Sequence, residues 1–148
     1  MSEFSNKMQS AVNKKFIKNM VETASPMQLI IILYDGAIQW LQMSKQEIKK
    51  NAGQPIPDWT DFSLYMGKAI AILTHLQESL DRNQSKEFAE GLFDLYNFMK
   101  TSLFKSNMKK NENDINKIIQ LLKDLKSGWQ EAIKNVSANT STTPQTVA

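Results

Sequence analysis

The sequence predicts an all-α protein, an antiparallel up-down four-helix bundle with a short N-terminal cap segment. Four segments carry apolar residues spaced three and four apart, which is the period of an amphipathic α-helix. Short stretches rich in Gly, Pro, Asn and Asp separate these segments, and short connections favour antiparallel neighbours. No segment alternates apolar and polar residues with period two, so we expect no sheet.

The length and composition are typical of one soluble domain. The chain has 148 residues, of which 41% are hydrophobic and 22% are charged. We divide it into an N-terminal arm or cap (1–24), a four-helix bundle (25–136) and a tail (137–148). The tail consists mainly of Ser, Thr, Asn and Pro without periodicity, so we expect it to be disordered.

The first helix is expected from Ser25 to Lys50. Ser25 is a suitable N-cap, Pro26 suits the first turn, and Gln28 completes a capping box. Apolar residues cover most of this helix, whereas a bundle helix usually hides one stripe of roughly 100°. It is therefore either a central helix wrapped by its own chain or a helix whose spare stripe binds a partner. One side stripe, the candidate spare stripe, comprises Leu29, Ile32, Trp40 and Met43, and the other side carries Met27, Ile31 and Ile38.

The second and third helices follow a loop containing Gly53, Pro55 and Pro57. We expect Asp58 or Asp61 to cap the second helix and Ser85 to cap the third. The expected core residues of the second helix are Phe62, Tyr65, Met66, Ala69, Leu73, Leu76 and Leu80. Those of the third helix are Phe88, Leu92, Leu95, Tyr96, Met99 and Leu103.

Two aromatic residues of the third helix, Phe93 and Phe104, project from the side opposite its core stripe. One exposed aromatic residue carries little information, but two on one outward face indicate a possible second contact surface. We therefore expect Phe93 and Phe104 to form a surface for a partner or for self-association.

The fourth helix is expected to begin at a cap formed by Asn111 or Asn113. It has a single apolar stripe, and its opposite face carries mostly Lys, Asp, Gln and Asn, which is typical of an ordinary bundle helix. The stripe comprises Ile115, Ile118, Ile119, Leu122, Leu125, Trp129 and Ile133.

The residues that would carry catalysis or bind metal are largely missing. There is no Cys and only one histidine, His75, and the residue three positions before it is Ile72, so no Glu-x-x-His pair exists. No Ser-His-Asp arrangement and no glycine-rich phosphate loop can be assembled. We expect no enzyme activity, no cofactor and no metal.

Charge and hydropathy indicate the compartment and the class of partner. The net charge is +3, Arg82 is the only arginine, and acidic residues are interspersed, so we expect no nucleic-acid binding. No run of about 18 apolar residues exists, so we expect no membrane insertion. The N-terminus lacks the apolar core of a secretory signal, so we expect a cytoplasmic protein.

The segment Thr23-Ala-Ser-Pro-Met-Gln-Leu-Ile-Ile-Ile-Leu-Tyr-Asp-Gly-Ala-Ile resembles the signature of the FliS family, the flagellin-specific export chaperones. Leu95-Tyr96-Asn97-Phe98-Met99 resembles a second family motif, Leu-Tyr-Asp-Tyr-Met. Asn107 matches the turn before the last helix, and Leu122, Leu125, Trp129 and Ala132-Ile133 match its C-terminal pattern. The resemblance covers about residues 14–134 and implies the same four-helix bundle.

The resemblance implies a cytosolic chaperone that binds the disordered C-terminal region of flagellin. Such a chaperone prevents premature polymerisation and assists flagellar type III export; an export-gate component or co-chaperone is a further candidate partner. A helical adaptor for another secretion or regulatory partner is the alternative. A metal-dependent bundle enzyme is a further class, which an elemental assay for bound metal would test. We expect a monomer or a weak homodimer.

The family carries a tyrosine in its N-terminal cap, where this chain has Phe16. Apolar residues of the arm recur at helical spacing, so the arm is either a packed segment or a movable flap. We expect Phe16, Ile17 and Met20 to form a flap that competes with the client. The surface beneath this flap is expected to comprise Leu29, Ile32, Leu33, Trp40 and Met43.

Overall fold

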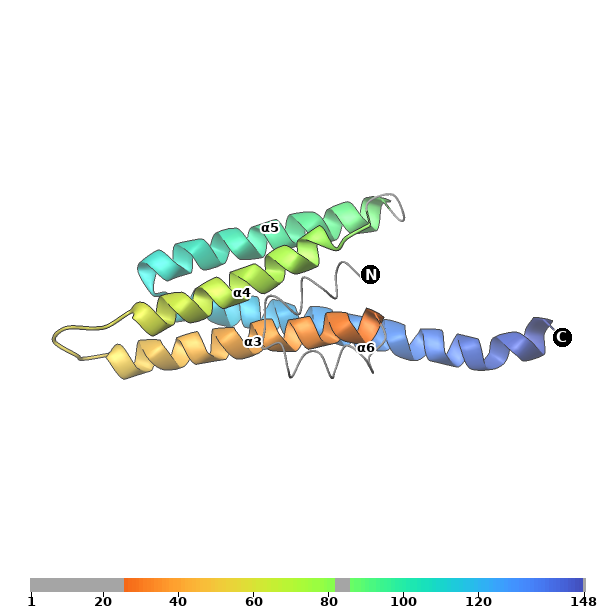
Figure 1. Cartoon of the computed structure of the whole chain (residues 1–148), viewed down its shortest axis with the longest axis horizontal. Helices are drawn as coiled ribbons and strands as arrows, with labels where there is room; N and C mark the ends of the chain where they lie inside the picture. Colours follow the sequence, from red (N-terminus) through yellow and green to blue (C-terminus); the bar gives the residue numbers. More distant parts are fainter. Residues whose placement is uncertain (1–25, 82–85, 148) are drawn as a thin grey trace.

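The computed structural model describes residues 26–81 and 86–147 and contains four helices in this part of the chain. They are α3 (Pro26–Asn51), α4 (Thr60–Glu78), α5 (Lys86–Lys109) and α6 (Glu112–Val147). The described residues contain no strand, so the all-α fold class is confirmed. Successive helices run in opposite directions, and α6 extends past the ends of the others (Figure 1).

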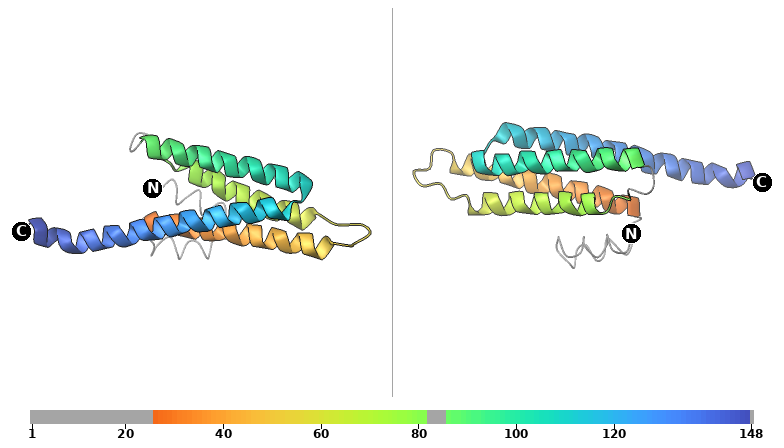
Figure 2. Two further views of the ribbon diagram at one scale, coloured as in Figure 1. Left: turned by 180° about the vertical axis from the view of Figure 1, so that it is seen from behind. Right: turned by 90° about the horizontal axis from the view of Figure 1, so that it is seen from above.

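The four helices form a closed ring of neighbours. Each helix packs against the next one along the chain, and α6 returns to pack against α3. Two further views show the same antiparallel order (Figure 2). The α3–α4 seam and the α5–α6 seam are consequently on opposite faces of the bundle.

The helix ends agree with local capping chemistry. The side-chain oxygen of Asn111 accepts hydrogen bonds from the backbone N–H groups of Asn113 and Asp114, which confirms the expected cap of the last helix. Asp58 accepts a hydrogen bond from the backbone N–H of Thr60, and this bond lowers the pKa of the Asp58 carboxyl. Asp58 therefore stabilises the start of α4, although Trp59 occupies the position next to the helix.

The turn between α5 and α6 depends on an unusual lysine. Lys110 has a φ of 55°, a left-handed conformation that costs a non-glycine residue about 1–2 kcal/mol. Its ammonium group lies 5.4 Å from the ring centroid of Trp59 and 5.2 Å from that of Phe62. These cation–π contacts offset part of the backbone cost and join the turn to the start of α4.

Helices α3 and α4 approach closely at Gly36. A Cβ atom added at this glycine would lie 3.2 Å from Cδ1 of Ile72 in the core. The close approach explains a glycine in mid-helix, where it otherwise costs about 1 kcal/mol relative to alanine. Gly67, on α4, has no atom within 4 Å of the same hypothetical Cβ, so packing does not require a glycine there.

The N-terminal arm and the C-terminal tail expected from the sequence compare with the structure in different ways. The arm (1–24) lies outside the described residues. The tail was expected to be disordered from residue 137, but α6 continues as helix to Val147. Once a helix is nucleated, each added residue other than proline gains one backbone hydrogen bond, so weak helix formers can extend an existing helix, although Pro144 adds no such bond. The structure differs from the expected tail in this respect, and the domain division itself stays a prediction.

We predict opposite effects of side chains added at the two glycines. Gly36→Leu should lower the free energy of unfolding by about 1–3 kcal/mol, because it overpacks the contact with Ile72. Gly67→Ala should raise it by about 0.5–1 kcal/mol, because alanine is the better helix former and has space there. Urea unfolding followed by circular dichroism measures both. Equal destabilisation by the two changes would contradict the close approach of α3 and α4.

Candidate functional site

The spare stripe predicted on the first helix lies along the α3–α4 seam. Leu29 and Leu33 are buried in the core, whereas Ile32, Trp40 and Met43 are half-buried. The indole of Trp40 stacks on the ring of Tyr65 of α4, with centroids 5.7 Å apart. The protein's own α4 therefore covers part of this stripe at Trp40, and Ile32, Trp40 and Met43 stay partly accessible.

The flap residues Phe16, Ile17 and Met20 lie outside the described residues. Their placement over α3 stays a prediction.

Phe93 and Phe104 differ in their surroundings. The Phe104 side chain is 56% exposed, whereas Phe93 is half-buried. Gln77 of α4 donates hydrogen bonds from Nε2 to the Phe93 carbonyl (3.0 Å) and to Oδ1 of Asn97 (2.8 Å). Lys100 donates to Oε1 of Gln77 at 2.7 Å. The Phe93 end of this face therefore belongs to a polar α4–α5 contact, and Phe104 is the more accessible aromatic.

An open groove between α5 and α6 was not predicted from the sequence. It has a cavity volume of about 310 Å³ and a mostly apolar lining. Phe98 is 59% exposed beside it, and Asp114 and Lys117 supply the charged part of the lining. The lining residues are Phe98, Ser102, Asp114, Lys117, Ile118 and Leu121. A groove with apolar walls and a few charges suits the side chain of an amphipathic segment.

Phe88 was expected in the core, and this expectation is wrong. Its side chain is 60% exposed, and its ring meets that of Trp129 edge to face with centroids 6.2 Å apart. Helical periodicity shows which side of a helix faces its neighbour. It does not show how much of that side the neighbour covers. Phe98 could have been found from the sequence, because it is an aromatic residue outside the core stripe of its helix. Phe88 gave no such signal.

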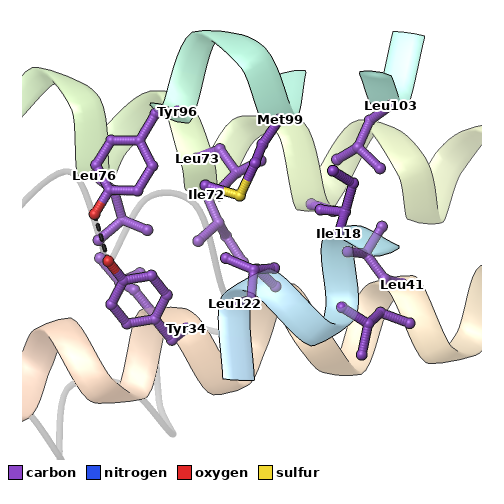
Figure 3. Packing of buried hydrophobic residues seen from close by; sticks show 14 of the residues in the cluster. Tyr34, Leu41, Ile72, Leu73, Leu76, Tyr96, Met99, Leu103, Ile118 and Leu122 are labelled. Atoms are coloured by element: carbon purple, nitrogen blue, oxygen red, sulfur yellow. Dashed lines mark hydrogen bonds between the residues drawn. The ribbon is translucent and has the colours of Figure 1, made fainter. Parts of the chain in front are cut away.

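Three polar groups from three helices meet inside the apolar core. The hydroxyls of Tyr34 (α3) and Tyr96 (α5) lie 2.5 Å apart, and Nε1 of Trp129 (α6) donates to the Tyr34 hydroxyl at 2.9 Å. The two tyrosines belong to the buried core cluster, with Leu76 beside them (Figure 3). Burial raises the pKa of both phenols, and for Tyr96 the proximity of Tyr34 raises it further.

Each residue of the motif Leu33-Tyr34-Asp35-Gly36 takes part in helix packing. Leu33 lies in the core, Tyr34 makes the hydrogen bonds just described, and Gly36 allows α4 to approach. The Asp35 carboxylate forms an ion pair with the Lys126 ammonium group on α6 at 2.6 Å. The motif therefore joins α3 to all three other helices.

Neither a metal-ligand cluster nor a membrane-spanning helix is found among the described residues. They contain no group of three or more His, Cys, Asp or Glu side chains that could hold a metal ion. His75 is half-buried, and within this part of the chain its Nδ1 has no hydrogen-bond partner. No helix among the described residues is long and apolar enough to cross a membrane.

Comparison with known proteins gives consistent matches over most of the chain. The family model described as flagellar protein FliS matches residues 8–136. The flagellar secretion chaperone FliSB of Pseudomonas aeruginosa is 30% identical over 113 residues, which cover 76% of this chain and 85% of that protein. The flagellar secretion chaperone FliS of Vibrio cholerae is 25% identical, covering 82% of this chain and 85% of its own. For FliS of Bacillus subtilis the identity is also 25%, with 80% and 83% covered.

The buried phenols predict a loss of stability at alkaline pH. The folded protein keeps the Tyr96 proton at a pH where the unfolded chain releases it, because the folded-state pKa is raised. The resulting stability is fully present below the unfolded pKa of about 10 and is lost as the pH rises above it. Tyr96→Phe removes this contribution, so wild type should lose more unfolding free energy than the variant between pH 8 and pH 11. Urea unfolding at both pH values measures the losses, and equal losses would contradict a buried, protonated Tyr96.

Proposed function

The chain belongs to the FliS family of flagellar secretion chaperones, and from this premise we propose that its client is the disordered C-terminal region of flagellin. In this proposal the protein binds flagellin in the cytoplasm before export. Binding covers apolar segments that would otherwise support premature polymerisation, and it keeps the client available to the flagellar export machinery. The protein acts by binding alone and carries out no reaction.

The observation that carries this proposal is the groove between α5 and α6. Its apolar walls, formed by Phe98, Ile118 and Leu121, leave a space of about 310 Å³ open to solvent. A disordered client has apolar side chains without a core of its own, and ordering one of them in the groove buries apolar surface on both partners. Each fully buried large apolar side chain contributes about 1.5–3 kcal/mol. Several such contacts are required, because ordering a disordered segment costs about 2–5 kcal/mol or more.

The α3–α4 seam is the second place where we propose that the client binds. Ile32, Trp40 and Met43 are its partly accessible apolar residues, and Leu29 and Leu33 support them from the core. The arm residues Phe16, Ile17 and Met20 would occupy this seam in the absence of client. Flagellin would then displace the arm.

Phe93 and Phe104 remain the proposed second surface. An export-gate component, a co-chaperone or a second copy of the chain would bind there. The protein alone is then a monomer or a weak homodimer.

The proposed function is tested by titrating the full chain with a peptide of flagellin's C-terminal region from the same organism. We expect one-to-one binding, micromolar or tighter, with a negative heat-capacity change from buried apolar surface. Absence of binding by a correctly folded protein would contradict the proposed client and leave an adaptor for another partner.

We predict that Phe98→Ala weakens binding of this peptide about tenfold, equivalent to about 1.4 kcal/mol. Phe104→Ala is the matched control, since Phe104 is similarly exposed (56% against 59%) but does not line the groove. It should leave the affinity unchanged. Isothermal titration calorimetry measures both variants. If only Phe104→Ala weakened binding, the conclusion would be that the client binds at the proposed second surface and not in the groove.

The proposed flap leads to a separate prediction about flagellin affinity. Phe16→Ala should strengthen flagellin binding several-fold, because the client no longer competes with a well-seated arm. Phe4→Ala, which changes the same kind of residue outside the proposed flap, should have no effect. Titration calorimetry gives the affinities, and hydrogen exchange of the α3 and arm amides reports the protection given by the arm. Unchanged affinity and unchanged protection in Phe16→Ala would rule out the flap.

A further inference from the structure

Trp129 belongs both to the core and to the α5–α6 surface. On its inner side the indole N–H donates to the Tyr34 hydroxyl at 2.9 Å. On its outer side the indole ring meets the exposed ring of Phe88 edge to face. Trp129 thus connects the buried Tyr34 hydroxyl to an aromatic pair at the surface.

The Phe88–Trp129 pair extends the apolar surface of the groove along the same two helices. Leu121, which lines the groove, is followed on α6 by Leu125 and then by Trp129, and all three pack against the core. On the facing helix, Phe98 beside the groove and Phe88 beside Trp129 are both exposed. A client segment lying along the seam from the groove would meet Trp129 at its end.

The inner hydrogen bond controls the orientation of the indole. Indole has one N–H donor, and here the donor points at an oxygen that is completely buried. Among the described side chains, Trp129 is also the last residue of α6 that packs against the core. The ring also packs against the core and against Phe88. The hydrogen bond is the directional contact among these, so its loss would leave the orientation of the ring to less directional packing.

We propose that Tyr34 is a positioning residue for client binding: its hydroxyl holds Trp129 in the orientation that completes the apolar α5–α6 seam. This proposal rests on the proposed function, since it assumes that a client segment lies on the seam. Tyr34 does not touch the client, because its side chain is completely buried. Tyr34 acts by orienting Trp129, and the orientation of Trp129 in turn sets its contact with Phe88.

The two tyrosines of the buried pair provide a matched experiment. Tyr34→Phe removes the acceptor of the Trp129 N–H and keeps the ring, whereas Tyr96→Phe removes a hydroxyl from the same pair but leaves that acceptor in place. A purely structural role predicts similar effects of the two changes. A positioning role predicts that only Tyr34→Phe alters Trp129 and the affinity for client.

The first measurement uses the flagellin C-terminal peptide and calorimetry. We expect Tyr34→Phe to raise Kd about tenfold and Tyr96→Phe to raise it less than about twofold. In a Trp129→Phe background, which already lacks the donor, adding Tyr34→Phe should change Kd no further. Equal effects of the two tyrosine changes, or an undiminished effect of Tyr34→Phe in that background, would overturn the proposal.

The second measurement reads Trp129 without any client. The indole N–H of Trp129 gives a separate nuclear magnetic resonance signal, and its hydrogen exchange should be fast in Tyr34→Phe and slow in both wild type and Tyr96→Phe. Unchanged exchange in Tyr34→Phe would overturn the positioning role even if wild type binds flagellin. A different outcome is that wild type fails to bind flagellin although the exchange of the Trp129 N–H changes as expected. The proposed function would then be wrong, and so would the role of Tyr34 in client binding.

Discussion

The hydrogen-bonded group of Tyr34, Tyr96 and Trp129 is the interaction on which the rest of the bundle depends. An apolar core tolerates many small shifts of one helix against another, because dispersion contacts have little directional preference. A buried hydroxyl has no such freedom, since losing its partner costs about 1–3 kcal/mol. The group connects α3, α5 and α6, including the diagonal pair α3 and α5, and thereby selects one arrangement of these three helices.

The fourth helix is fixed by different contacts. Gly36 lets α4 approach α3 closely, and the hydrogen bonds of Gln77 join α4 to α5. Apolar surface remains in several places, among them the partly accessible seam at Trp40, the groove at Phe98 and the face at Phe104.

The sequence predicted the helices well because their apolar period, breaks and caps are local properties, as Asn111 illustrates. The candidate surfaces stay predictions, and local patterns alone cannot fix them because exposure depends on the neighbouring helix. For the stripe containing Leu29 and Trp40, the sequence left open whether the protein itself or a partner covers it; in the structure Leu29 is buried and Trp40 stacks on Tyr65 of α4. Phe88 has core spacing but lies on the surface. The hydrogen bond between Tyr34 and Tyr96 joins residues distant in the chain, and no local pattern indicates it.

The most direct test of this account is a double-mutant cycle on the two buried tyrosines at pH 7. Urea unfolding of wild type, Tyr34→Phe, Tyr96→Phe and the double variant gives the coupling free energy, and both changes remove only a hydroxyl. The account predicts a coupling of about 1 kcal/mol, because each hydroxyl stabilises the fold through the other. Additivity of the two single effects within about 0.3 kcal/mol would contradict it. The diagonal helices would then be held by apolar packing alone.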